Sequence, residues 1–336
     1  MDERYFNREI QNPQSAIRNP QSAIEKGVIP AAGLGTRMFP LARTVPKELF
    51  PVDGRPVIHH VVEEAATAGL SEVAIVIRPG KEIIREYFDR LPEGERPGGV
   101  RIHYVYQDEP RGLGDALLCA RDFVGTSPFA VLLPDDLYLD ANPTRDLVMA
   151  FQEFPHPILA VGAVPAGTAG GYGKVALEAR RVGERLRRVH YMFPKGEGPR
   201  TTNPAAGHLN SFGRYLLTPE VFEPTYDRHP GVELDDGDLI RGLIRRGPVY
   251  GFLVSYTRFD TGRISTYADA VAAFNPLSFS SEFGVRSSEF RVKINQPRTP
   301  GSGLRAPNSE LRTPNSELRY EVNDADTDHQ AVLQRR

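Results

Sequence analysis

Three short apolar runs, separated by segments with helical spacing, constrain the fold of this chain more than any other feature of its sequence. The runs occupy residues 28–32, 73–77 and 129–133. Continuous runs of this length are typical of strands buried on both faces, because each side of the sheet then meets apolar neighbours. The alternation therefore predicts an α/β fold, with a central mixed, mostly parallel sheet and helices on both of its faces.

Further elements follow the same pattern through the middle of the chain. Helices are predicted at 56–68, 81–88, 115–123, 238–245 and 265–274. Strands are predicted at 100–106, 158–164, 174–177, 186–192 and 249–255. No linker-like stretch divides these segments, so we predict one domain, spanning residues 27–275, with strands inserted in its second half.

Short direct repeats mark both ends of the chain. Residues 12–18 are nearly repeated by 19–24, and residues 306–312 by 313–319. These segments are too polar to bury a face, so residues 1–26 and 276–336 are predicted to be disordered tails. The repeats also raise the hypothesis that the tails are translated flanking DNA, which mass spectrometry of the native protein would refute by finding both tails intact.

Composition and charge argue against several classes of function. The formal net charge of -2 over 336 residues gives no reason to expect a nucleic-acid or membrane-surface partner. The single cysteine, Cys119, rules out an internal disulfide and a cysteine-based zinc cluster. No apolar stretch is long enough to span a bilayer and no signal peptide is recognisable, so the expected compartment is the cytoplasm.

A glycine-rich turn follows the first buried run. Gly33 and Gly35 expose backbone N–H groups with no Cβ in the way, and Arg37 and Lys47 follow close behind. Donors and cations in this order suit a phosphate chain, although such turns are also common where nothing binds. The turn is not a dinucleotide fingerprint, since Met38 replaces the third glycine, and no Gly-Lys-Ser/Thr follows as a P-loop requires.

Aspartates follow two of the predicted strands. Asp135 and Asp136 come directly after the run at 129–133, and Asp260 follows a later strand. The carboxyl ends of parallel strands meet at one edge of a sheet, so we expect Asp135 there together with the Gly33 turn. Two aspartates converging on one Mg²⁺ fit phosphoryl or nucleotidyl transfer, and the alternative is that they cap the next helix or turn.

The remaining polar groups indicate positioning of substrates rather than covalent chemistry. Gln107 is placed to give paired amide contacts to a base edge, although an exposed loop glutamine is commoner, and residues 111–115 form a second glycine turn ahead of a helix. The eight histidines show no metal-ligand spacing, and no Ser-His-Asp or Cys-His arrangement is visible. Such a site would stabilise charge while the substrates supply the nucleophile.

Together these motifs resemble those of bacterial UTP–glucose-1-phosphate uridylyltransferases, or UDP-glucose pyrophosphorylases, of the sugar nucleotidyltransferase family. The match begins with Ala31-Ala32-Gly33-Leu34-Gly35-Thr36-Arg37-Met38 and Pro46-Lys47-Glu48. It continues in the family's order with His60-Val61-Val62-Glu63-Glu64, Gln107, Gly112-Leu113-Gly114-Asp115-Ala116, Leu133-Pro134-Asp135, Gly171-Tyr172-Gly173, Gly213-Arg214-Tyr215, Glu233-Leu234, Asp238 and Asp260-Thr261-Gly262. The resemblance covers nearly all of residues 27–275 and implies a Rossmann-like nucleotidyltransferase fold.

The resemblance also implies a nucleotide-binding set of residues. The backbone of Ala32 and Gly33 is expected to contact the uracil of UTP, and Gln107 its edge, with Gly112 nearby. The rest of the expected set consists of Leu34, Gly35, Thr36 and Glu48.

The chemistry that the resemblance implies is transfer of a uridylyl group. Arg37 and Lys47 would hold the UTP phosphates and, with Asp135, form the catalytic set, while Asp135 and Asp260 would bind Mg²⁺. The implied substrates are UTP and a sugar-1-phosphate, glucose-1-phosphate first, and the products are UDP-glucose and pyrophosphate. Gly171 and Lys195 are the expected sugar contacts. Assembly into a homo-oligomer is left open.

One segment departs from the family's pattern. Where the family has a Val-Glu-Lys-Pro run that holds the sugar and its phosphate, Met192 and Phe193 replace the glutamate and the lysine. Lys195 would substitute only if the strand end shifts. The alternatives are a different sugar-1-phosphate or nucleotide, or a catalytically weakened homologue that binds a nucleotide sugar and regulates. A dinucleotide-dependent oxidoreductase is disfavoured by the missing glycine.

Overall fold

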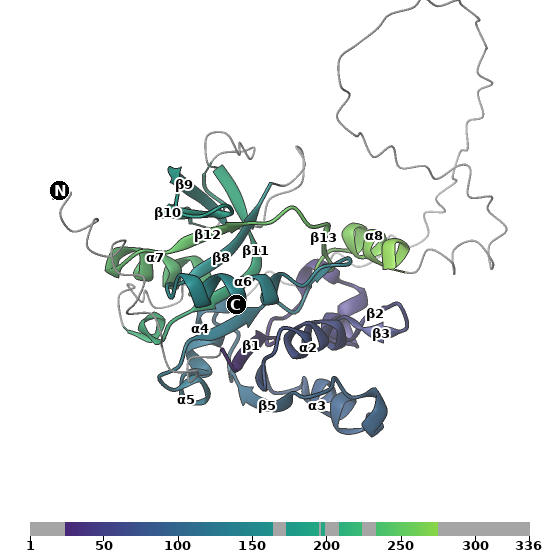
Figure 1. Cartoon of the computed structure of the whole chain (residues 1–336). Coiled ribbons are helices and arrows are strands. Elements are labelled where there is room, and N and C mark those ends of the chain that lie inside the picture. The colour runs from purple at the N-terminus through teal and green to yellow at the C-terminus, as the bar shows by residue number, and fades with distance from the viewer. Residues whose placement is uncertain (1–23, 164–172, 195, 199–207, 224–232, 275–336) are drawn as a thin grey trace, which may run out of the picture. The chain divides into compact units, whose positions relative to one another are not determined.

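The computed structural model describes residues 24–163, 173–194, 196–198, 208–223 and 233–274 (Figure 1). The predicted C-terminal tail and most of the N-terminal one lie outside these residues. At the N-terminal boundary, Ile24 is buried and Lys26 opens the first strand, so the strand begins slightly before residue 27.

A nine-stranded mixed sheet forms the centre of the molecule, in the order β5-β4-β1-β6-β11-β8-β12-β10-β9. The strands are β1 (Lys26–Pro30), β4 (Glu72–Ile77), β5 (Arg101–Tyr106), β6 (Phe129–Leu132), β8 (Ile158–Gly162), β9 (Lys174–Arg181), β10 (Leu186–Met192), β11 (His208–Leu217) and β12 (Tyr250–Leu253). The α/β class and the mixed sheet are therefore confirmed. Parallel pairing joins β5, β4, β1 and β6, and also β8 and β12.

The second half of the sheet contains more antiparallel strand pairs than the sequence indicated, because its central strand, β11, was not predicted. β11 runs antiparallel to β6, β8 and β9 and joins the two halves of the sheet. Its sequence carries Asn210, Ser211, Gly213 and Arg214 in the middle, and all of these positions are buried. Polar residues and a glycine inside a run hide the apolar signal by which buried strands are recognised.

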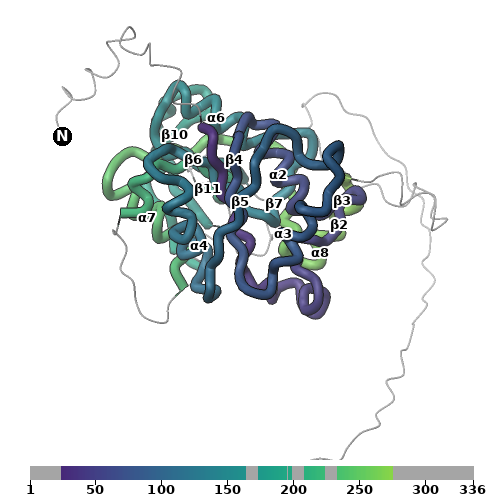
Figure 2. Tube along the Cα trace, turned by 90° about the horizontal axis from the view of Figure 1, so that it is seen from below, coloured from purple at the N-terminus to yellow at the C-terminus, as the bar shows by residue number. Residues whose placement is uncertain are grey.

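Helices cover both faces of the sheet, as predicted. α2 (Val57–Thr67), α3 (Glu82–Asp89) and α6 (Pro143–Glu153) bury their apolar sides against one face, and α4 (Leu113–Cys119), α5 (Arg121–Val124) and α7 (Asp236–Arg246) against the other. Neighbouring strand residues divide between the two cores, with Val28 in one and Ile29 in the other. Figure 2 shows α2 and α3 on the opposite side of the sheet from α4 and α7.

The smaller elements bring distant parts of the chain together beside the sheet. β7 (Asp136–Tyr138) pairs with β13 (Arg258–Asp260), and β2 (Pro51–Val52) with β3 (Arg55–Pro56). α8 (Ile264–Phe274) packs on β13 and β2. The 3₁₀ turns are η3 (Thr36–Met38), η4 (Leu41–Arg43), η5 (Lys47–Leu49), η6 (Glu93–Glu95) and η7 (Pro219–Phe222). None of the described helices is long and apolar enough to cross a membrane.

Several predicted boundaries differ from those observed. The helix predicted at 115–123 is two short helices, α4 and α5, which meet at Ala120. α6 was not predicted, although its start carries a recognisable signal: the Asn142 side chain accepts a hydrogen bond from the Arg145 amide, and Pro143 occupies the first turn. The strand predicted at 158–164 ends at Gly162.

Candidate active site

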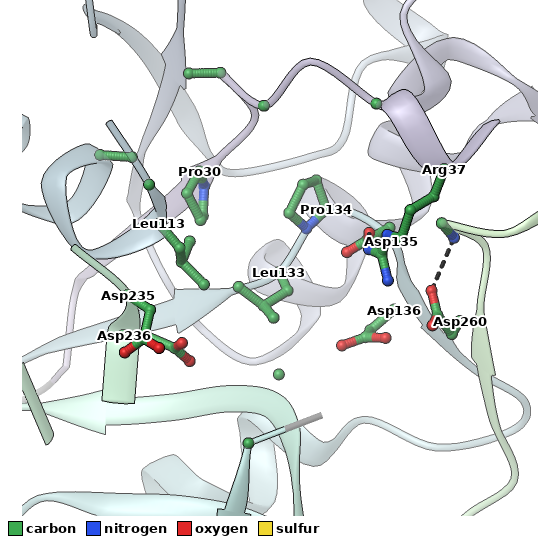
Figure 3. Close-up of a pocket in the computed structure, with 18 of the residues that line it drawn as sticks. Pro30, Arg37, Leu113, Leu133, Pro134, Asp135, Asp136, Asp235, Asp236 and Asp260 are labelled. Atoms are coloured by element: carbon green, nitrogen blue, oxygen red, sulfur yellow. Dashed lines mark hydrogen bonds and ion pairs between the residues drawn. The ribbon is translucent and has the colours of Figure 1, made fainter. Parts of the chain in front are cut away.

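A cavity of about 540 Å³ opens at the carboxyl ends of β1, β5 and β6, where the predicted sheet edge places a ligand. Its opposite wall comes from β11, the end of β10 and the start of α7. In Figure 3, Arg37, Asp135 and Asp260 gather toward one end of the cavity, and Asp235 and Asp236 toward the other. The site is therefore assembled from both halves of the chain.

Most of the predicted site residues line this one cavity. Those present in its wall are Ala32, Gly33, Leu34, Gly35, Thr36, Arg37, Lys47, Glu48, Gln107, Gly112, Asp135 and Asp260. The two predicted sugar contacts, Gly171 and Lys195, lie outside the described residues. The residues that the sequence analysis grouped as nucleotide-binding, catalytic and metal-binding therefore lie together in one cavity.

The glycine turn after β1 is built as an open concavity. Gly35 adopts a left-handed conformation with φ of 69° and leads into η3, whose last residue, Met38, is fully buried. No atom lies within 4 Å of the point where a Cβ on Gly33 would stand. The aliphatic part of the Lys47 side chain lies 3.7 Å from the point where a Cβ on Gly35 would stand. Lys47 is therefore beside the turn, as Arg37 is. Backbone and cation are therefore placed together, as a phosphate chain requires.

Lys47 and Asp135 form the central ion pair of the site. The Nζ atom of Lys47 contacts Oδ2 of Asp135, and Nη2 of Arg37 lies 3.5 Å from the same oxygen. Burial alone would raise the pKa of Asp135, but the Lys47 ammonium and the Arg37 guanidinium lower this pKa to about 2. Burial likewise opposes the charge on Lys47, yet Asp135 and Glu48 raise its pKa above the ordinary value. Both groups are charged at neutral pH.

Asp135 and Asp260 approach each other beside Gly262. A Cβ on Gly262 would stand 2.5 Å from Oδ2 of Asp135, 2.9 Å from Oδ1 of Asp260 and 3.0 Å from Nη2 of Arg37, so two carboxylate oxygens and one guanidinium surround the space that glycine leaves open. Among the described residues no three His, Cys, Asp or Glu side chains are grouped to hold a metal. Two carboxylates leave the other positions of a Mg²⁺ ion to phosphate and water oxygens, which suits a phosphate-binding site.

The pairing of β7 with β13 explains why these two aspartates meet. Asp136 and Asp260 are register partners in that ladder. Beyond it, Thr261 donates two hydrogen bonds to the carbonyl of Asp135, from its backbone N at 2.7 Å and from Oγ1 at 3.0 Å. The end of β13 therefore holds the turn that presents Asp135.

Asp136 has a different environment from its neighbour. Its Oδ1 accepts two hydrogen bonds from Arg258, while its buried Oδ2 has no hydrogen-bond partner among the described residues. Burial raises the pKa of this carboxyl to about 6, against the effect of Arg258. A Cβ on Gly213 would overlap the carboxylate, so glycine is required there. Asp136 lines the cavity, but its carboxylate is hydrogen-bonded to Arg258 of β13. The Asp135 carboxylate instead forms ion pairs with Lys47 and Arg37.

The second glycine turn, at residues 111–115, is hydrogen-bonded to the segment that precedes α7. Gly112 has φ of 104°, and a Cβ on it would overlap the carbonyl of Leu234. Leu234 donates to the Arg111 carbonyl and accepts from the Gly114 amide, each at 2.9 Å. Nε2 of Gln107, predicted to read a base edge, donates to the Gly112 carbonyl at 3.1 Å and to Asp115 at 2.9 Å. In this structure the amide nitrogen of Gln107 thus holds the turn.

Gly112→Ala tests how far the nucleotide side depends on this close approach. We expect the added methyl group to push the turn away from residue 234 and to raise the Kd for UTP by about tenfold or more, because a misplaced contact residue loses much of its binding energy. Isothermal titration with UTP measures this. Gly94→Ala is the matched control, since its Cβ would meet nothing within 4 Å. An unchanged Kd in Gly112→Ala would contradict the assignment.

The other wall of the cavity carries the departure from the family's pattern. Met192 and Phe193 both line the cavity, and Met192 is almost fully buried, with its Cε 2.5 Å from the position of a Cβ on Gly173. The Phe193 ring packs edge-on against Tyr191, with 5.1 Å between ring centroids. The surface offered here is therefore apolar, where the family pattern implies a carboxylate and an ammonium.

A hydrogen-bonded chain on the same side was not singled out from the sequence. Ser211 Oγ donates to the Tyr215 hydroxyl at 3.0 Å, and that hydroxyl donates to Asp236 at 2.6 Å. Asp235 caps α7 through a reciprocal bond with Asp238, a capping box that is visible in the sequence. All but Asp238 line the cavity. The capping box marks the start of α7, two residues before the helix predicted at 238–245, and only the fold places it at this site.

Comparison with known proteins agrees with the α/β fold described above. The model of the nucleotidyl transferase family matches residues 26–275. The chain therefore belongs to the nucleotidyl transferase family, and the resemblance drawn from its motifs is confirmed.

Relatives and solved structures narrow the similarity to one branch of that family. A UTP–glucose-1-phosphate uridylyltransferase of Bacillus subtilis is 34% identical over 262 residues, which cover 71% of this chain and 87% of the relative. That of Staphylococcus haemolyticus is 33% identical over 259 residues, covering 71% and 88%. A crystal structure of UDP-glucose pyrophosphorylase with UDP-glucose has a TM-score of 0.67 at 29% identity, covering 75% of this chain and 99% of that one. UTP-bound UGPase of Acinetobacter baumannii has a TM-score of 0.65 at 30% identity, covering 75% and 93%.

Proposed function

We propose that this protein is a UTP–glucose-1-phosphate uridylyltransferase, which converts UTP and glucose-1-phosphate to UDP-glucose and pyrophosphate. The observation that carries the proposal is the convergence of Arg37, Lys47, Asp135 and Asp260 beside an open glycine turn at the carboxyl edge of the sheet. Cations next to backbone donors suit a triphosphate, and paired carboxylates suit the metal that accompanies it. In this proposal residues 27–275 form the catalytic domain, which acts in the cytoplasm.

The reaction needs positioning and charge stabilisation rather than a protein nucleophile. An oxygen of the sugar phosphate attacks the α-phosphorus of UTP in line, and the bond to the β-phosphate oxygen breaks as pyrophosphate leaves. Ala32, Gly33 and Gln107 would orient the uracil, while Arg37 and Lys47 would hold the phosphates. Asp135 and Asp260 would hold Mg²⁺, which would supply positive charge to the phosphate oxygens. The Lys47 ammonium, kept charged by its carboxylate neighbours, would stabilise the departing pyrophosphate.

The proposal is tested by pyrophosphate release. The purified full-length chain is incubated with UTP, glucose-1-phosphate and Mg²⁺, and pyrophosphate and UDP-glucose are quantified together. A panel that replaces UTP by dTTP, ATP or GTP, and glucose-1-phosphate by other sugar-1-phosphates, runs alongside. Equal amounts of both products from UTP and glucose-1-phosphate support the proposal. No turnover with any pair, combined with tight binding of UDP-glucose, would favour a regulatory homologue instead.

The apolar wall at the end of β10 favours a second candidate, a uridylyltransferase that prefers another sugar-1-phosphate. Met192 and Phe193 offer no charge to the sugar hydroxyls or the sugar phosphate. A sugar with fewer hydroxyl groups would lose less binding free energy against this wall, because burying a hydroxyl without a hydrogen-bond partner is unfavourable. In the same panel, this candidate predicts a higher kcat/KM for a deoxy sugar-1-phosphate than for glucose-1-phosphate.

Phe193→Lys tests whether the sugar phosphate binds near this wall. If glucose-1-phosphate binds with its phosphate near this wall, we expect the new ammonium to lower its KM by about tenfold, the effect of one charge-assisted hydrogen bond. Steady-state kinetics at saturating UTP measure this. His190→Lys is the control, because His190 is an exposed residue of β10 and does not line the cavity. A KM unchanged by Phe193→Lys would place the sugar phosphate elsewhere.

A further inference from the structure

Lys81 is a buried lysine that stands behind the nucleotide side of the cavity. It immediately precedes α3, and only 3% of it is exposed. Its Nζ donates to the carbonyl of Ala31 at 2.8 Å and to Oε2 of Glu48 at 2.9 Å. Glu48 is 1% exposed, so both charges of this pair are removed from water. Lys81 does not line the large cavity, and the reaction described above does not use it.

The three partners belong to segments that are separated in the sequence. Ala31 is the residue between the end of β1 and the glycine turn, and its amide donates to the Val76 carbonyl of β4 at 2.7 Å. Glu48 directly follows Lys47 in η5. Lys81 follows β4 by a short loop. One ammonium therefore joins the start of the glycine turn to the segment that carries Lys47.

A buried ion pair of this kind is poorly explained by stability alone. Taking both charges out of water is costly, and well-packed apolar residues often stabilise a fold as well or better. Burial lowers the pKa of Lys81, against the effect of Glu48 beside it. Apolar residues could not donate hydrogen bonds to the Ala31 carbonyl and the Glu48 carboxylate at once. These two directional bonds fix the positions of the segments that carry their acceptors.

We infer that Lys81 is a positioning residue for the nucleotide: it holds the glycine turn and Lys47 at the spacing that the phosphates of UTP require. The inference rests on the proposed function and deepens it, because it assigns the relative placement of the two phosphate-binding segments to one side chain. Lys81 does not touch the substrate. It acts through Ala31, whose carbonyl it binds, and through Glu48, whose neighbour is Lys47.

Two variants of the full chain test the inference by UTP titration without sugar, with thermal unfolding measured in parallel. Lys81→Met removes both hydrogen bonds and leaves the Glu48 charge unpaired. Lys81→Met combined with Glu48→Gln removes that unpaired charge, but the hydrogen bonds that join Ala31 to Glu48 through Lys81 are still absent. Because UTP binding is measured without turnover, failure of the proposed reaction does not obscure the result.

We expect Lys81→Met to raise the Kd for UTP by about tenfold and to lower the melting temperature. The double variant recovers much of the melting temperature but keeps the raised Kd. Recovery of UTP binding in the double variant would overturn the inference, since a purely structural pair predicts that both properties recover together.

Lys26→Met provides the control for a lost lysine at the other end of β1. Nζ of Lys26 donates to the carbonyls of Phe123 and Val124, at 2.6 and 3.2 Å, and lies away from the cavity. We expect it to lower the melting temperature without changing the Kd for UTP. If Lys26→Met weakened UTP binding as much as Lys81→Met, the effect would be general loosening of β1 and the inference would fail. Should Lys81→Met not fold, the double variant carries the comparison.

Discussion

Asp135→Asn is expected to lower the rate of UDP-glucose formation by about 10²–10³-fold, the loss typical of removing one preorganised charged group from a site that stabilises a transition state. The carboxylate has two functions in the proposed site. It is the counter-charge of Lys47, whose Nζ it contacts, and it is one of the two predicted Mg²⁺ ligands. The isosteric amide keeps the shape of the side chain but removes the negative charge, so both functions weaken together.

The measurement for Asp135→Asn combines kinetics with metal binding. Pyrophosphate release gives kcat, and titration of Mn²⁺ in the presence of UTP, followed by electron paramagnetic resonance, gives the metal affinity. Asp89→Asn is the matched control, because Asp89 is an exposed residue of α3 in a surface ion pair with Arg85. Full activity with unchanged Mn²⁺ affinity in Asp135→Asn would refute the metal assignment. Lost activity with unchanged Mn²⁺ affinity would leave only the role beside Lys47.

Arg214→Met is expected to lower the free energy of unfolding by about 3–5 kcal/mol, the cost of breaking a buried ion pair by removing one partner. Arg214 is fully buried and binds both oxygens of Glu64, with Nε–Oε1 at 2.9 Å and Nη2–Oε2 at 2.7 Å. It also donates to the carbonyls of Leu133, Gly213 and Asp136. Methionine fills much of the volume but leaves a buried carboxylate and three carbonyls without these donors.

Urea unfolding followed by circular dichroism measures the stability of Arg214→Met. The control is Arg90→Met, whose side chain is 79% exposed and pairs with Glu86 one helical turn away. Exposed pairs of this kind contribute about 0.5 kcal/mol or less, so the control should unfold close to wild type. Equal midpoints for the two variants would show that the Arg214 network does not carry the stability assigned to it. Because Arg214 binds the turn on either side of Asp135, we also expect Arg214→Met to reduce activity.

Local patterns predicted the N-terminal half of the fold and the phosphate side of the site. The apolar runs that became β1, β4 and β6 are continuous, and buried parallel strands leave that signature in the sequence. Parallel strands end at one sheet edge, so residues that follow them, such as Gly33 and Asp135, could be placed in one site before the structure was known. This holds whatever the order of the parallel strands in the sheet.

The second half was harder to predict because its signals are not local. β11 lies at the centre of the sheet, yet its buried Arg214 and Asn210 give it a polar sequence, and the ion-pair partner of Arg214, Glu64, lies in α2. The hydrogen-bonded chain from Ser211 through Tyr215 to Asp236 likewise joins β11 to α7. Burial of a polar side chain depends on partners that the surrounding sequence does not contain.

Sequence patterns alone indicate which chemical groups follow which strands: backbone donors at Gly33 and Gly35, cations at Arg37 and Lys47, and carboxylates at Asp135 and Asp260. Which of these groups pair with one another depends on the folded arrangement of the chain. Lys47 meets Asp135 across 88 residues, and Thr261 binds the Asp135 carbonyl across 126. Strand periodicity and turn chemistry act between near neighbours, whereas ion pairs and metal sites depend on strand order and crossovers, which bring distant segments to one edge.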